Sequence, residues 1–225
     1  MNKQQLTGLT ESHLKVIQTE YQSIKVNYLI EQDIERLVIA ASKAGFQLEV
    51  ASGFRDFQRQ KSIWNRKCSG QAVILDDQSQ PIVFSTLTEQ QRLFAILRWS
   101  ALPGASRHHW GTDFDVYAKN LLPHGSRLQL EPWEYLAGHQ APFYNWLCEH
   151  LSLFGFFFPY KRDLRGVAAE PWHISHRESS EACLAELSAS LILETLAIEG
   201  VLDLQTIAAN FDAIYSQYIT NICKD

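Results

Sequence analysis

The alternation of apolar and polar positions predicts helices and short strands that follow one another along the chain. Apolar residues recur at helical spacing over residues 28–41, and Gly45 is expected to end that helix. Residues 46–51 alternate between apolar and polar side chains instead, which predicts a strand. This strand leads into Ser52-Gly53-Phe54-Arg55, after which a second helix is expected.

The middle of the chain contains another alternating segment, at residues 112–118. One face of this predicted strand carries Phe114, Val116 and Ala118, and the other carries Asp113, Asp115 and Tyr117. Because successive side chains of a strand point to opposite faces, the two aspartates share a face. Before this strand, residues 68–85 resemble a loop or hairpin, and Thr86 with Glu89 fits a capping box that starts a further helix.

The last third of the chain is richer in helical patterns. Residues 143–154 form a strongly amphipathic pattern, and residues 156–158 predict a buried strand. Because a proline favours extended geometry in the residue before it, Pro171 places Glu170 in a strand or at a strand edge. Residues 178–222 contain two helical patterns that are split near Gly200.

A few short strands among several helices favour an α+β fold with a small, largely antiparallel sheet flanked by helices and a C-terminal helical extension. We expect an irregular N-terminal arm at residues 1–27 and a main domain at residues 28–177. We expect residues 178–225 to form a helical extension packed on the same domain.

The composition excludes several classes of protein. The 225 residues carry a formal net charge of −5 without a long basic run, so nucleic acid is not expected as a partner. No apolar stretch approaches the length of a transmembrane segment. The polar N-terminus lacks the apolar region of a signal peptide, which predicts a cytoplasmic protein. The four cysteines are scattered and form no zinc knuckle or redox motif.

The candidate chemistry lies in two short clusters. His108 and Asp115 are seven residues apart, and Glu170 precedes His173 by three. Each pair alone is better explained by a surface histidine and a capping carboxylate, and Arg55 alone by a surface salt bridge. Together, two histidines and one aspartate provide three zinc ligands and leave a fourth position for water, the pattern of catalytic zinc.

These residues also fit three motifs in the order of one family. The chain resembles the VanY-type D-alanyl-D-alanine metallopeptidases, a group that also includes lysostaphin-like endopeptidases and the hedgehog signalling domain. The motif S-x-H-x-x-G-x-A-x-D is met by Ser106, His108, Gly111 and Asp115, the motif E-x-W-H by Glu170, Trp172 and His173, and S-x-[YF]-R by Ser52, Phe54 and Arg55, followed by Gln58 and Gln60. The resemblance covers about residues 45–176.

The resemblance implies a role for each matched residue. Zn²⁺ would be held by His108, Asp115 and His173. Glu170 would act as general base on the attacking water, and Arg55 would stabilise the oxyanion or the substrate carboxylate.

Further roles are expected around this centre. Ser106 and Gln60 are expected to bind substrate. Asp113 stands where the family usually has alanine, and it could hold a ligand histidine or compete with Asp115 for the metal. Trp172 is expected to pack behind the ligands. His176 is either near the ligands or a surface residue.

The expected activity is that of a zinc peptidase acting on peptidoglycan peptides or muropeptides, with a D,D-carboxypeptidase as the first choice. A D-Ala-D-Ala dipeptidase and an L-Ala-D-Glu endopeptidase of the endolysin type are alternatives among enzymes. A non-catalytic zinc-binding interaction domain is the alternative of another class. Glu170 argues against it, because a binding module needs no base three residues before a metal ligand.

Overall fold

The centre of the molecule is a four-stranded antiparallel sheet. The computed structural model describes residues 1–224. The strands lie in the order β3 (Leu48–Ser52), β6 (Asp113–Ala118), β8 (His173–His176) and β7 (Phe156–Phe157). In the register of this sheet, Asp115 pairs with Ser52 on one side and with His173 on the other. The sheet therefore aligns residues of all three sequence motifs in one row.

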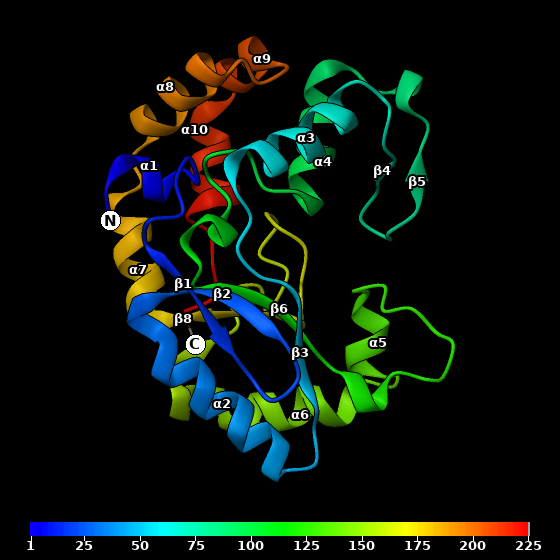
Figure 1. Ribbon diagram of the computed structural model, residues 1–225. Coiled ribbons are helices and arrows are strands. Elements are labelled where there is room, and N and C mark those ends of the chain that lie inside the picture. Colours follow the sequence, from blue (N-terminus) through cyan, green and yellow to red (C-terminus); the bar gives the residue numbers. More distant parts are fainter. Residues whose placement is uncertain (225) are drawn as a thin grey trace.

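One face of the sheet is apolar and covered. It packs against α2 (Glu31–Lys43), α6 (Ala141–His150) and a hairpin of β1 (Leu14–Gln18) and β2 (Ser23–Asn27). Figure 1 shows α2 and α6 together below the sheet. The sheet contributes Phe114, Val116, Ala118 and Ile174 to this core, and each of them is fully buried.

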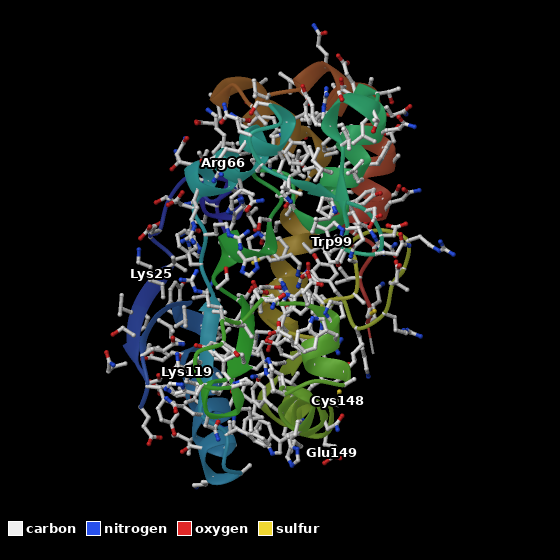
Figure 2. The ribbon with its side chains drawn as sticks, turned by 90° about the vertical axis from the view of Figure 1, so that its right-hand side faces the viewer. Lys25, Arg66, Trp99, Lys119, Cys148 and Glu149 are labelled. Atoms are coloured by element: carbon white, nitrogen blue, oxygen red, sulfur yellow. The ribbon has the colours of Figure 1, made fainter. Side chains whose placement is uncertain are left out.

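A second core lies on the other side of the sheet, above it in Figure 1. It is built by α1 (Lys3–Leu6), α3 (Phe57–Cys68), α4 (Glu89–Trp99), α7 (Arg177–Glu186), α8 (Ala189–Glu199), α9 (Leu204–Ala209) and α10 (Phe211–Ile214). The chain thus forms two apolar cores with the polar face of the sheet between them. Figure 2 shows the molecule from the side, with Arg66 of α3 and Trp99 of α4 in its upper half and Cys148 of α6 in its lower half.

Short elements complete the molecule at its right-hand side in Figure 1. They are a small hairpin of β4 (Ile74–Leu75) and β5 (Pro81–Ile82), and α5 (Pro132–Leu136). Single turns occur at Tyr28–Ile30, Phe84–Thr86, Arg107–Trp110, Lys119–Leu121, Leu151–Phe154 and Tyr215–Ile219. Within residues 1–224, every helix is too short or too polar to cross a bilayer.

The expected α+β class and the small antiparallel sheet between helices are confirmed, and so is the division of β6 into an apolar and a polar face. Two expectations were wrong in detail. Residues 1–27 are not irregular, because they contain α1 and the β1–β2 hairpin. The capping box before α4 is formed by Thr88 and Gln91, two residues after the expected pair.

Candidate active site

A tight turn brings His108 back over the sheet. His108 lies in the single turn Arg107–Trp110, and Gly111, with φ of 66°, ends it in the left-handed region. A Cβ atom at this position would also clash with Leu14 Cδ2 and lie 3.0 Å from the backbone nitrogen of Asn27. Glycine is therefore required there both by backbone conformation and by space.

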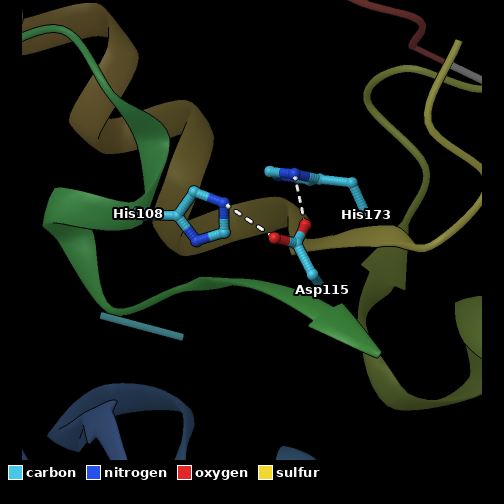
Figure 3. Close-up of side chains that lie close together, drawn as sticks. All are labelled: His108, Asp115 and His173. Atoms are coloured by element: carbon cyan, nitrogen blue, oxygen red, sulfur yellow. Dashed lines mark ion pairs between the residues drawn. The ribbon is translucent and has the colours of Figure 1, made fainter. Parts of the chain in front are cut away.

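His108, Asp115 and His173 converge on one point, as Figure 3 shows. One potential ligand atom from each residue lies within 4.8 Å of the others. Asp115 Oδ2 is 3.5 Å from His108 Nε2, and Asp115 Oδ1 is 3.2 Å from His173 Nδ1. All three side chains are buried. The predicted ligand set is thus assembled from a turn and two neighbouring strands.

Both imidazoles are oriented by their second nitrogen. His108 Nδ1 lies 3.0 Å from the carbonyl oxygen of Gly53, and His173 Nε2 lies 3.1 Å from Asp113 Oδ1. This pattern, in which the outer nitrogen donates to a carbonyl or carboxylate, directs the other nitrogen to a metal. Asp115 Oδ1 and His173 Nδ1 are buried and lie close to each other, but neither atom forms a well-aligned hydrogen bond with any described residue.

The charges at this point also favour a cation. Burial lowers the pKa of His108 to about 3, so its imidazole is neutral. Burial opposes protonation of His173, but contacts with Asp113, Asp115 and Glu170 raise its pKa well above the ordinary value. Two imidazoles and a carboxylate that leave one side open are a donor set that fits Zn²⁺.

Asp113 is part of a second, fully buried layer under His173. Arg107 Nε donates to Asp113 Oδ1 over 2.7 Å, and Thr112 Oγ1 donates to Asp113 Oδ2 over 2.7 Å. Burial alone would raise the pKa of Asp113, but Arg107 and His173 hold it well below its ordinary value. Asp113 therefore stays ionised and holds His173 from the side opposite to Asp115, which matches the first of its two expected roles.

Sequence reasoning missed Arg107. Its guanidinium also donates to Ser175 Oγ over 2.6 Å, so it ties the turn that carries His108 to the strand that carries His173. The signal was present, since a buried aspartate that departs from a motif needs a partner of opposite charge. The position of that partner within the turn becomes evident only in three dimensions.

Glu170 and Arg55 approach the same centre from two loops. Glu170 Oε2 lies 3.3 Å from His173 Nδ1, and burial raises the pKa of this carboxyl, which makes it a stronger base. Arg55 donates to Gln60 Oε1 over 2.8 Å and to Ser52 Oγ over 2.9 Å, both neutral groups. The charge of Arg55 is therefore not neutralised by a direct ion pair with any described residue.

A cavity of about 300 Å³ connects these groups. Its wall includes all three potential ligands together with Glu170, Arg55, Ser106 and Trp172. Ser106 Oγ is buried and has no hydrogen-bond partner among residues 1–224, which leaves it available for a substrate.

Two candidate residues lie elsewhere. Gln60 is fully buried and uses both ends of its amide within the protein, on Arg55 and on the carbonyl oxygen of Ala101. It holds Arg55 and does not line the cavity. The side chain of His176 lies on the opposite face of β8 from His173, where its Nε2 is 3.2 Å from Asp33 Oδ2 of α2. His176 is thus neither near the ligands nor on the surface, and instead links the sheet to α2.

Comparison with known proteins gives one family. The model of the VanY family, described as D-alanyl-D-alanine carboxypeptidase, matches residues 23–179. An uncharacterised protein of Haemophilus influenzae is 36% identical over 121 residues, which span 52% of this chain and 92% of the relative.

Two solved structures share the fold. A vancomycin resistance D,D-pentapeptidase VanY in complex with Zn(II) is 24% identical, with a TM-score of 0.50 over 78% of this chain and 85% of that one. The L,D-carboxypeptidase LdcB is 20% identical, with a TM-score of 0.53 over 81% of this chain and 78% of that one.

Proposed function

This chain belongs to the VanY family of D-alanyl-D-alanine carboxypeptidases, and we propose that it is a zinc D,D-carboxypeptidase that removes the last D-alanine from peptidoglycan peptides. The observation that carries the proposal is the shared cavity. One arginine without an ion-pair partner, one buried carboxyl and the His-Asp-His group all line it. The VanY structure solved with Zn(II) supports the choice of metal.

Each residue of the site would have a separate role in the reaction. Bound zinc supplies Lewis-acid activation, which lowers the pKa of water and polarises a carbonyl. Glu170 takes the proton from the attacking water and passes it to the leaving amine. Its raised pKa suits both steps, because the carboxyl must accept a proton and then return it. His108, Asp115 and His173 would hold the zinc.

Arg55 distinguishes a carboxypeptidase from its alternatives. A carboxypeptidase must recognise the free terminal carboxylate, and a guanidinium fork pairs well with a carboxylate. Because Arg55 is held by Gln60 and Ser52, two of its donors are used and the rest of its fork is available in the cavity. We therefore assign the terminal carboxylate of the substrate to Arg55.

The test uses zinc-loaded protein and a peptide that ends in D-Ala-D-Ala, with products identified by mass spectrometry. Release of one D-alanine is expected, with loss of cleavage when the terminal carboxylate is amidated. Arg55→Ala should abolish cleavage of the free peptide, whereas Arg36→Ala, on the far side of the sheet, should not. Equal cleavage of the amidated peptide, with products cut inside the stem, would show an endopeptidase.

Glu170→Gln separates a catalyst from a binding module. The glutamine keeps the shape of the side chain but cannot accept a proton, so activity should fall by at least about 10²-fold. Zinc content and the unfolding temperature should remain close to those of the unchanged protein. Full activity in this variant would remove Glu170 from the mechanism.

A further inference from the structure

Lys67 lines the same cavity as the candidate catalytic residues, but nothing in the mechanism uses it. It lies in the last turn of α3. Its Nζ donates to Ser100 Oγ over 2.7 Å, and no carboxylate of residues 1–224 lies within ion-pair distance of it. Arg98, by contrast, forms ion pairs with Asp77 and Asp163. Lys67 is thus a half-buried ammonium with a neutral partner only.

An ammonium in this position favours an anionic ligand. Burial lowers the pKa of Lys67, and no nearby charge offsets that effect. A partly desolvated cation is stabilised by a nearby carboxylate, because the two opposite charges form charge-assisted hydrogen bonds. Glu131 enters the cavity from the loop before α5, but it is not in ion-pair contact with Lys67. A carboxylate that pairs with Lys67 would therefore come from outside the described residues.

The geometry of α3 gives the place of this anion. Arg55 lies just before the first turn of the helix, and Lys67 lies at its other end. Hydrogen bonds link the two charged groups through few residues: Arg55 donates to Gln60, Gln60 donates to the carbonyl oxygen of Ala101, and Lys67 donates to the adjacent Ser100. An extended peptide spans at most about 3.6 Å per residue, so a substrate of about four residues can reach from Arg55 to Lys67.

We propose that Lys67 is a specificity-determining residue, which binds a substrate carboxylate within about four residues on the amino side of the scissile bond. This inference rests on the proposed function, in which Arg55 holds the carboxyl end of the substrate. A carboxypeptidase has a single residue beyond the scissile bond, so a group far from Arg55 must lie on the amino side. The substrate class is a short peptide with an acidic residue near its D-Ala-D-Ala end.

The test compares matched peptides that end in D-Ala-D-Ala and differ only in glutamate or glutamine at the third or fourth residue from the cleaved bond. The unchanged protein should prefer the glutamate peptide by about 10-fold or more in kcat/KM, the usual worth of a hydrogen bond between charged groups. The preference should lie mainly in KM. Lys67→Met should abolish it, and Lys67→Arg should restore most of it. Lys43→Met, an exposed lysine of α2, is the matched control.

Ser100→Ala separates recognition from simple structural support. This variant removes the hydrogen bond to Lys67 but leaves the ammonium, so the preference for glutamate should persist. If Lys67→Met and Ser100→Ala instead slow both peptides equally and lower the unfolding temperature, Lys67 is a structural residue and the proposal fails.

Binding of both peptides to the Glu170→Gln protein, measured by calorimetry, tests Lys67 independently of cleavage. Tighter binding of the glutamate peptide that depends on Lys67 supports the inference even if no bond is cut. Equal binding of the two peptides overturns it, even if D-alanine is released as proposed.

Discussion

The two faces of β6 bury side chains of opposite character. On one face, Phe114 and Val116 enter a core shared with α2 and α6. On the other face, Asp113 and Asp115 are equally buried but meet histidines and an arginine. The six consecutive buried residues of β6 thus alternate between an apolar and a polar environment.

The comparison shows what burial requires on each side. Apolar side chains need only neighbours of suitable size, and many different side chains can supply that. A buried carboxylate needs a partner of opposite charge in one position, because an unpaired buried charge is strongly destabilising. The polar face is therefore specified by individual residues, and the apolar face by its overall pattern.

The largest effect is expected at His173, on the polar face of β8. His173→Ala should remove the bound zinc and lower activity by more than about 10³-fold, since Lewis-acid help is worth several kcal/mol and about 1.4 kcal/mol is tenfold. Metal analysis of the purified protein checks this, with the exposed His124→Ala as control. Full zinc occupancy in His173→Ala would mean that the ligand set is wrong.

A smaller effect is expected for Asp113 than for its neighbour on the same face. Asp115→Asn should lose the metal, whereas Asp113→Asn should keep it with affinity about 10–100-fold lower, the usual cost of losing a group that orients a ligand. Competition with a chelator measures both affinities, and Asp212→Asn on the surface is the control. The reverse ranking would make Asp113 the ligand.

The smallest effect on the site is expected directly beside His173, on the apolar face. Ile174 is fully buried between the sheet and its helices. Ile174→Val should lower the free energy of unfolding by about 0.5–1.5 kcal/mol. Zinc content and kcat/KM should not change. Denaturant unfolding of the zinc-loaded protein measures the loss, and the exposed Ile198→Val should cause none. A large loss of metal in Ile174→Val would show that the two faces are not independent.

Prediction from sequence succeeded where a pattern is local. The alternation of β6 and the periodicity of α2 involve neighbours in the chain, and both are visible without knowledge of the fold. The β1–β2 hairpin was missed because its strands are short and expose Val16 and most polar positions, so the alternation is weak. Its burial comes from α2 and the sheet, which no local pattern reveals.

The candidate site shows the same limit. Motif positions brought His108, Asp115, Glu170 and His173 together correctly in space, because the motifs already describe a structure. The role of His176 could not be predicted from its position in the sequence. His176 follows His173 closely, but its side chain points to the opposite face of the sheet. Gln60 was likewise assigned by its motif position, and only the structure shows that Arg55 and Ala101 use both ends of its amide.

His109, the neighbour of a candidate ligand, has a consequence for the order in which the chain is synthesised. Its Nε2 accepts from the backbone of Gly104, its Nδ1 donates to the carbonyl oxygen of Arg55, and its ring lies against Gly8. During translation the N-terminal arm and the Arg55 loop therefore emerge long before the turn that fixes them. The metal centre also needs His173, which is synthesised later still. The nascent chain therefore has no complete ligand set until most of the protein has left the ribosome.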